Sequence, residues 1–186
     1  MRKMGGSLDE QDMMTILNMC GYTKDEVRFF IETGTYKGDT SRAACKVFDT
    51  VCTVEIVQEL YEESAQKSFK EGAPVHHYLG DSVRVIPAII ERHNIHQPSF
   101  WYLDAHQSGA DTSNNGTYVP LIDEINTILT HITDKRGIYV IDDLRLFTHY
   151  DWESISLRTI CDTFSLKVEP TILKRFIWND RFIVAI

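Results

Sequence analysis

The chain has 186 residues, of which 43% are hydrophobic and 25% charged, and it carries a formal net charge of −8. This length and composition fit one globular domain that buries a sizeable core. Phosphate backbones are bound through clustered Lys and Arg, and no such cluster occurs here, so nucleic acid is disfavoured as a partner. No apolar run approaches the roughly 20 residues that cross a bilayer, and the first residues lack a secretory signal. We therefore expect a soluble, cytoplasmic protein without a membrane partner.

Five short apolar runs alternate with helix-like stretches, the pattern typical of a parallel sheet covered by helices. In chain order, we expect a strand over 27–31, a helix over 40–48, strands over 51–54 and 75–79, a helix over 83–93, a strand over 100–103, a helix that opens at Pro120, a strand over 138–141 and a helix over 152–164. Two further apolar runs, 173–178 and 181–186, flank a turn-prone Asn-Asp pair and predict an antiparallel hairpin at the sheet edge. The predicted fold class is α/β, with a doubly wound, mostly parallel seven-stranded sheet and helices on both faces.

The four cysteines are scattered along the chain. Cys20, Cys45, Cys52 and Cys161 form no CxxC pair, and no histidine stands beside them at zinc-finger spacing. Buried free thiols are therefore predicted in place of a zinc site or a disulfide framework.

Polar residues end each of the five apolar runs. They are Glu32, Glu55, Gly80-Asp81, Asp104 and Asp142-Asp143. Ligands of open α/β sheets bind at the carboxyl ends of the strands, so these side chains are expected to gather at one rim. Any single one is best interpreted as a strand stop or a helix N-cap, but their convergence favours a functional site.

The segment Glu32-Thr-Gly-Thr-Tyr-Lys-Gly38 connects the first strand to the first helix. Glycines there let a ligand approach the backbone closely, and free N–H groups point outward. The segment is neither GxGxxG nor GxxxxGK[ST], which disfavours a pyrophosphate or a nucleoside triphosphate. Glu55, at the end of the next strand, can accept hydrogen bonds from both hydroxyls of a ribose. A nucleoside without phosphate is predicted.

The order of ETGTYKG, Glu55, GDS and LDAH resembles that of the class I S-adenosylmethionine-dependent methyltransferases, and the resemblance covers Val27 to Ile186. It implies a Rossmann-like fold and S-adenosyl-L-methionine as cofactor. It places the two loop glycines by the amino-acid end of the cofactor, Glu55 at the ribose and the GDS segment by the adenine. The residues that it implies for cofactor binding are Glu32, Gly34, Thr35, Tyr36, Gly38, Thr40, Ser41, Glu55, Gly80, Asp81 and Ser82.

Asp104, Asp142 and Asp143 add three carboxylates at the ends of neighbouring strands, more negative charge than a hydroxyl-methylating site holds without a counter-ion. Carboxylate oxygens suit Mg²⁺ or Mn²⁺. The segments WYLDAHQSGADTSNNG, VPLIDEI and VIDDLRLF resemble those of metal-dependent O-methyltransferases that methylate sugars. This resemblance implies that the three aspartates bind the cation, which in turn holds a pair of acceptor oxygens and lowers the pKa of the reacting hydroxyl.

The predicted catalytic base is His106, because a neutral imidazole can accept a hydroxyl proton near neutral pH, and Asp104 is the alternative. His106 could instead orient a carboxylate, and His149 is a weaker candidate for the base. Arg145, near the aspartate pair, is best interpreted as part of a salt bridge. Residues 107–118 are rich in turn formers and predict either a cover over the acceptor or a flexible connection.

The predicted function is an S-adenosylmethionine-dependent, divalent-metal-assisted O-methyltransferase that acts on a sugar or glycan hydroxyl. One alternative is a metal-independent methyltransferase for another small molecule, such as an amine. Another is a non-catalytic module that binds the cofactor, and a nicotinamide-dependent oxidoreductase is disfavoured by the absent pyrophosphate loop. Residues 1–186 are expected to form one methyltransferase domain, by hypothesis a part of a longer glycan-building polypeptide.

Overall fold

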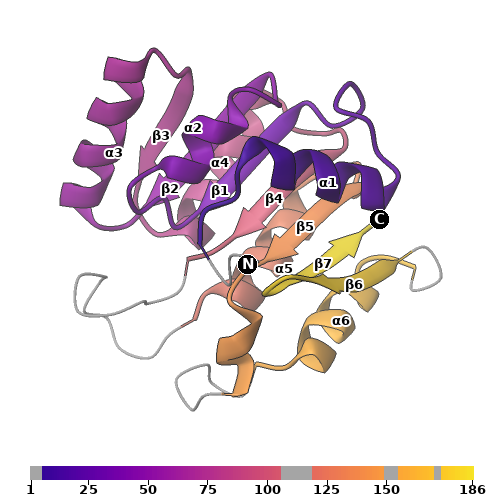
Figure 1. Ribbon diagram of the computed structural model, residues 1–186. Coiled ribbons are helices and arrows are strands. Elements are labelled where there is room, and N and C mark those ends of the chain that lie inside the picture. The colour runs from indigo at the N-terminus through magenta and orange to yellow at the C-terminus, as the bar shows by residue number, and fades with distance from the viewer. Residues whose placement is uncertain (1–5, 106–118, 149–154, 170–172) are drawn as a thin grey trace.

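A computed structural model describes residues 6–105, 119–148, 155–169 and 173–186, and a central sheet with helices on both faces dominates it (Figure 1). The strands are β1 (Phe29–Thr33), β2 (Thr50–Glu55), β3 (Val75–Leu79), β4 (Ser99–Leu103), β5 (Gly137–Ile141), β6 (Lys174–Trp178) and β7 (Arg181–Ala185). The helices are α1 (Glu10–Cys20), α2 (Asp39–Ala44), α3 (Gln58–Glu71), α4 (Ser82–His93), α5 (Leu121–His131) and α6 (Leu157–Ser165), with a short 3₁₀ helix η1 (Leu144–Thr148).

The seven strands follow the order β3-β2-β1-β4-β5-β7-β6. The first five are parallel, whereas β7 runs antiparallel to both β5 and β6. This arrangement confirms the predicted seven-stranded, mostly parallel sheet with an antiparallel hairpin at its edge. The strand order reverses between β1 and β4, so their carboxyl ends flank the crevice in which sheets of this kind bind ligands.

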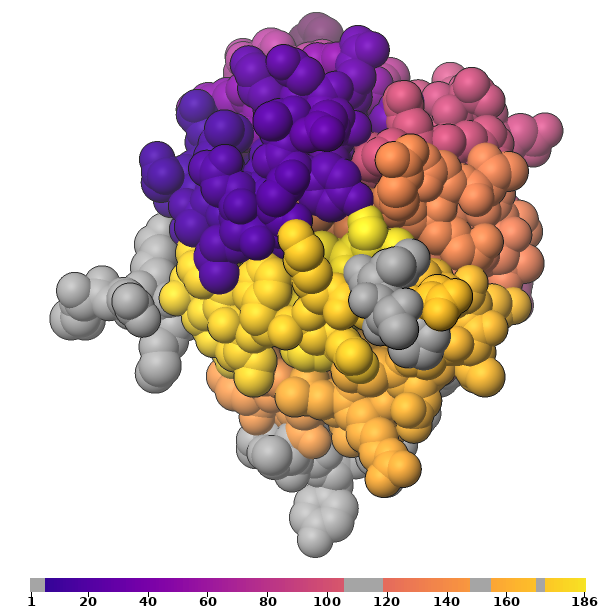
Figure 2. Space-filling model, turned by 90° about the vertical axis from the view of Figure 1, so that its right-hand side faces the viewer, coloured from indigo at the N-terminus to yellow at the C-terminus, as the bar shows by residue number. Residues whose placement is uncertain are grey.

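Two hydrophobic cores cover the two faces of the sheet. The first joins α1 and α2 to one face, where the rings of Phe30 and Phe100 stack with their centroids 5.5 Å apart. The second joins α4, α5 and α6 to the opposite face. The N-terminal region also lies against the C-terminal strands (Figure 2), where Lys174 donates a hydrogen bond to the carbonyl oxygen of Cys20.

Two strands end at different residues from those predicted, and the differences concern the candidate site residues Glu32 and Glu55. β1 extends through Glu32 to Thr33, and Glu32 pairs with Thr53 of β2 and Tyr102 of β4. Glu55 is the last residue of β2 and does not follow the strand. Pairing with neighbours on both sides decides where a strand ends, and a single apolar run does not contain that information.

Further differences concern the helices. α2 ends at Ala44, not at residue 48, because the next N–H groups close turns onto the carbonyls of Ala43 and Ala44. The sequence prediction named neither α1 nor α3. α1 had a readable signal, since Asp9 and Asp12 form a capping box at its start and Gly21, with φ 84°, ends it.

The cysteines are free thiols, as predicted, although only Cys20 and Cys52 are fully buried. Within the described ranges, no helix has the length and apolar character that a membrane span requires.

Candidate functional site

The polar strand endings meet at one edge of the sheet. The N–H of Asp104 donates to the carbonyl of Thr33 (3.1 Å), which joins the ends of β4 and β1. The N–H of Asp142 donates to the carbonyl of Leu103 (3.2 Å), which joins β5 to β4. On the other side, the N–H of Gly80 donates to the carbonyl of Glu55 (2.8 Å). These backbone bonds bring the predicted endings together.

Gly34 is required by packing between the β1 and β4 ends. Its φ is 81°, and a Cβ added there would lie 2.8 Å from the carbonyl carbon of Asp104 and 3.1 Å from the Cα of Ala105. The sequence prediction assigned this glycine to close approach of a ligand. In the structure, the backbone that follows β4 occupies the space, so the glycine fixes the crevice itself.

Glu32 is the centre of a buried polar cluster on the face covered by α2. Its carboxylate accepts a hydrogen bond from the hydroxyl of Thr53 (2.7 Å), and that hydroxyl lies 2.6 Å from the hydroxyl of Thr35. The pKa of Glu32 is raised to about 8, chiefly by burial and also by the charge of Glu55, although the hydroxyls of Thr53 and Ser41 act to lower it. Thr35, Ser41 and Glu55, which were all predicted for cofactor binding, therefore lie around the carboxyl group of Glu32.

The other predicted loop residues have separate environments. Tyr36 is half exposed and lies beneath the ammonium group of Lys37, which is 5.3 Å from the ring centroid. Thr40 is buried, and its hydroxyl accepts a hydrogen bond from the N–H of Leu8 (3.2 Å). Gly38, with φ 70°, is the N-cap of α2. The N-terminal segment therefore lies against the start of α2.

The carboxylate of Glu55 is largely satisfied by backbone. Oε1 accepts the N–H groups of Ile56 and Val57, both at 2.9 Å, and Oε2 accepts the N–H of Tyr36, also at 2.9 Å. Each carboxylate oxygen has two lone-pair directions, so one acceptor position remains, on Oε2. The predicted pair of ribose hydroxyls would therefore find room for a single hydrogen bond here.

Asp81 is the N-cap of α4. Its side chain accepts the N–H of Val83 (3.0 Å) and lies 3.6 Å from the guanidinium of Arg84. Asp81 thus caps a helix, which is the structural role that the sequence analysis considered for each polar strand ending. Ser82, the first residue of α4, is buried and its hydroxyl interacts with Glu124.

Glu124, on the first turn of α5, is a site residue that sequence reasoning missed. It is only 1% exposed, and its carboxyl interacts with the hydroxyls of Thr33 and Ser82. Burial raises its pKa to about 7, and its Oε1 has no hydrogen-bond partner in the described part of the chain. Its place in the helix was the available signal, since it stands three residues after Leu121 on the apolar face.

Asp104, Asp142 and Asp143 form what we call the acidic rim. Asp142 is 3% exposed and accepts a hydrogen bond from the hydroxyl of Tyr102, and its Oδ1 accepts the N–H of Asp143 (2.7 Å). Asp143, with φ 57°, forms an ion pair with Arg145, which also contacts Asp180. The predicted salt bridge of Arg145 is confirmed.

Arg181, the first residue of β7, was not predicted as a site residue. Its guanidinium lies 3.2 Å from the carboxylate of Asp142 and 6.0 Å from the ring centroid of Tyr102. The hairpin was expected from the sequence, but nothing in the apolar pattern indicated that its first residue reaches the end of β5.

The electrostatics of the acidic rim follow from this arrangement. Asp104 is partly buried, and desolvation raises its pKa well above the ordinary range, as do the charges of Asp142, Asp143 and Glu32. Arg181 opposes that rise. Burial also raises the pKa of Asp142, while Arg181 and the hydroxyl of Tyr102 counteract it. Asp104 is thus a carboxyl group with unusually high proton affinity.

The predicted divalent-cation site does not fit the observed arrangement. In the described ranges, no group of three His, Cys, Asp or Glu side chains is placed to hold a metal ion. Asp142 is engaged by Tyr102 and Arg181, and Asp143 is engaged by Arg145. The two arginines supply counter-charge that the sequence prediction had assigned to a metal. The predicted base His106, the weaker candidate His149 and the segment 107–118 lie outside the described residues.

No family model matches the sequence, and no curated protein matches it. By contrast, 359 chains of solved structures match the fold, so the assignment does not depend on one neighbour. An O-methyltransferase from Bacillus cereus in complex with SAH is 14% identical, with 95% of this chain and 79% of that chain covered and a TM-score of 0.59.

Two further solved structures agree with it. A cofactor-bound MTB protein, Rv0187, is 14% identical, with 97% of this chain and 81% of that chain covered and a TM-score of 0.60. An S-adenosylmethionine-dependent methyltransferase from Clostridium acetobutylicum is 10% identical, with 95% and 90% covered and a TM-score of 0.58. At these identities the likeness establishes the fold alone. The chain therefore has the fold that these three proteins share, one of which is an S-adenosylmethionine-dependent methyltransferase.

Proposed function

We propose that the chain is an S-adenosylmethionine-dependent methyltransferase that binds its cofactor along residues 32–41 and transfers the methyl group at the acidic rim. The observation that carries the proposal is the contact between Gly34 and the backbone of Asp104. It brings the cofactor loop and the candidate base together at the switch point of the sheet, where this architecture binds ligands. Neighbours that carry SAH support the same cofactor for this chain.

The charge of the site suits a sulfonium cofactor. The carboxylate of Glu55 accepts the N–H of Tyr36 in the loop, and the whole chain carries a formal charge of −8. A negative environment attracts the positive sulfonium and releases it once methyl transfer leaves a neutral thioether. The remaining acceptor position on Glu55 would take one ribose hydroxyl.

Methyl transfer to oxygen needs a base close to the acceptor. We assign this role to Asp104, because it lies against Gly34 of the cofactor loop and its carboxylate can accept the hydroxyl proton. The acceptor oxygen attacks the methyl carbon as the carbon–sulfur bond breaks, the hydroxyl proton passes to Asp104, and the cofactor leaves as S-adenosylhomocysteine. Holding the two reactants in line supplies much of the rate enhancement.

The acceptor that we propose is a hydroxyl of a sugar or glycan. The carboxylates of the acidic rim accept hydrogen bonds from neighbouring hydroxyls, and their charge disfavours acceptors that carry phosphate or carboxylate groups. The resemblance of the LDAH and IDD segments to those of sugar O-methyltransferases supports the same class.

Metal assistance is the competing form of this proposal. The carboxylate donor set suits Mg²⁺ or Mn²⁺ chemically. A cation would nevertheless require Asp142 and Asp143 to release Arg181 and Arg145. We therefore assign no step to a metal ion.

The first experiment is calorimetry with S-adenosylhomocysteine, followed by transfer of a labelled methyl group from the cofactor to a panel of sugars. We expect Asp104→Asn to bind S-adenosylhomocysteine like the wild type and to lose about 10²–10⁴-fold in turnover. Asp162→Asn is the matched control, because Asp162 is an exposed residue of α6. Absence of cofactor binding would refute the proposal. Binding with no transfer to any acceptor would favour the non-catalytic alternative.

A further inference from the structure

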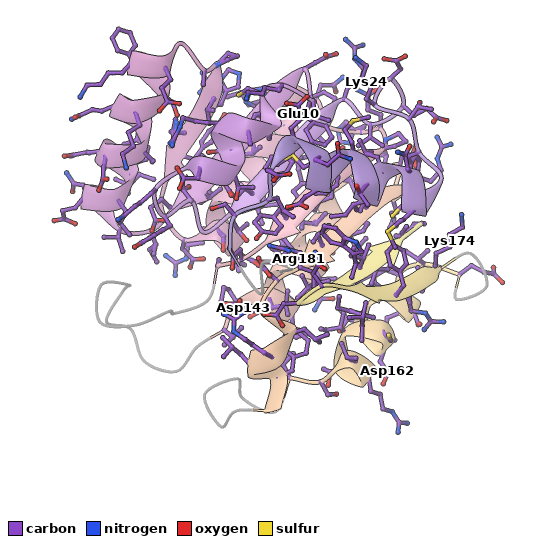
Figure 3. The ribbon with its side chains drawn as sticks, viewed as in Figure 1. Glu10, Lys24, Asp143, Asp162, Lys174 and Arg181 are labelled. Carbon is purple, nitrogen blue, oxygen red and sulfur yellow. The ribbon has the colours of Figure 1, made fainter. Side chains whose placement is uncertain are left out.

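A buried arginine occupies the acidic rim. Arg181 is 3% exposed and is the only Lys or Arg among the buried residues of the described ranges. Its guanidinium contacts Asp142 and the face of Tyr102, and it donates a hydrogen bond to the carbonyl of Gly6. Arg181 and Asp143 lie at the same end of the sheet (Figure 3).

Burial of a guanidinium is costly unless the charge is compensated. Here the compensation is incomplete in hydrogen bonding, because the Nε of Arg181 has no partner among the described residues. Hydrogen bonds made by the guanidinium therefore do not account for the burial of Arg181. Its compensation is electrostatic, since its guanidinium lies 3.2 Å from the buried carboxylate of Asp142.

The second arginine at the site cannot substitute for it. The side chain of Arg145 is 53% exposed and lies between Asp143 and Asp180, at the outer side of the acidic rim. Solvent screens a charge in that position, whereas a buried charge acts at close to full strength. Arg181 is thus the cation that acts on the inner carboxylates.

We propose that Arg181 is the resident counter-ion of the acidic rim, in the role that a divalent cation has in metal-dependent sites. It is a positioning residue: it fixes Asp142 and Tyr102 and sets the charge around Asp104. The expected effect of Arg181 on turnover rests on the proposed function. The expected effect of Arg181 on metal binding does not depend on it. Turnover is independent of added metal in the wild type. Loss of the arginine leaves a cluster of carboxylates that recruits a divalent cation.

The test compares wild type, Arg181→Lys, Arg181→Met and the control Arg136→Met, whose exposed arginine pairs with Asp134 at the opposite end of β5. Calorimetry measures the binding of Mn²⁺ and, separately, of S-adenosylhomocysteine. Methyl transfer is measured with EDTA, with Mn²⁺ and with added guanidinium.

We expect wild type and Arg136→Met to bind no Mn²⁺ and to keep full turnover in EDTA. Arg181→Met should gain Mn²⁺ binding, keep its affinity for S-adenosylhomocysteine and lose about 100-fold or more in kcat. Guanidinium or Mn²⁺ should restore part of that loss, and Arg181→Lys should retain an intermediate rate because it keeps the charge but not the planar donor group.

Two results would overturn the inference. One is wild-type turnover that EDTA abolishes and Mn²⁺ restores, because the counter-ion would then be the metal. The other is tight Mn²⁺ binding by the wild type, which can be measured even if Arg181→Met does not fold. If the wild type binds no S-adenosylhomocysteine, the proposed function fails, while the Mn²⁺ comparison still decides the role of Arg181.

Discussion

The guanidinium of Arg181 lies 3.2 Å from the carboxylate of Asp142, and both side chains are buried. The contact follows from topology. β7 runs antiparallel to β5, and Phe182 pairs with Ile141, so the first residue of β7 meets the residue that follows β5. A hairpin that closes the sheet edge thereby delivers a positive charge to the end of a parallel strand.

Tyr102→Phe should destabilise the protein by about 2 kcal/mol, because it removes a hydrogen bond to a buried, charged carboxylate. Tyr139→Phe is the control, since the hydroxyl of Tyr139 donates to the neutral carbonyl of Lys135 (2.9 Å). Its expected cost is about 1 kcal/mol. Urea denaturation of both variants measures the difference, and equal losses would contradict a charged partner for Tyr102.

Gly34→Ala should cost about 3 kcal/mol or more, because the new Cβ would overlap the backbone of Asp104, which cannot yield like a flexible side chain. Gly72→Ala separates the two causes. Gly72 also has a positive φ, 66°, but no atom lies within 4 Å of its added Cβ, so only backbone strain of roughly 1–2 kcal/mol is expected. Thermal unfolding that is equally affected in both variants would refute the close contact between Gly34 and the backbone of Asp104.

Glu55→Ala should weaken the binding of S-adenosylhomocysteine by at least about tenfold, through loss of a charged acceptor and of the anchor for the N–H of Tyr36. Glu55→Gln should lose less, because its amide oxygen can still accept the N–H groups of Ile56 and Val57. The exposed Glu59 of α3 gives the control Glu59→Ala. Calorimetry that finds the Glu55 variants unchanged would remove this residue from the cofactor site.

Glu124→Gln should change how stability depends on pH. Burial raises the pKa of Glu124 from 4.5 to about 7, so the folded state binds this proton more tightly than the unfolded state does. The associated stability is complete below pH 4.5 and is lost as the pH rises through 7. Relative to wild type, the variant should gain about 3 kcal/mol between pH 4 and pH 8.

Urea denaturation of wild type and Glu124→Gln at several pH values measures that gain. The exposed Glu91 of α4 supplies the control variant Glu91→Gln, which should follow the wild type throughout. Parallel curves for wild type and Glu124→Gln would show that the carboxyl of Glu124 titrates at an ordinary pKa.

Much of the fold could be predicted because its signals are local. The alternation of apolar runs with helical stretches indicated the parallel sheet, and the paired runs around Asn179 indicated the hairpin. α3 lacks an apolar stripe, since its buried residues are Ser64 and Ser68. α1 has one, at Met13, Ile16, Leu17 and Cys20, which the sequence prediction overlooked. The limits of β1 were displaced because strand pairing, and not composition, decides them.

The sequence by itself determined the order of the polar strand endings, and its strand-to-helix loop predicted the class of ligand. Those properties depend on residues close together in the chain. Only the tertiary structure decided the charge balance of the site, because the counter-charge on Asp142 comes from Arg181 on a distant strand, and a Coulomb energy depends on separation in space. The three aspartates alone predicted a metal ion, whereas the folded chain supplies two arginines beside them.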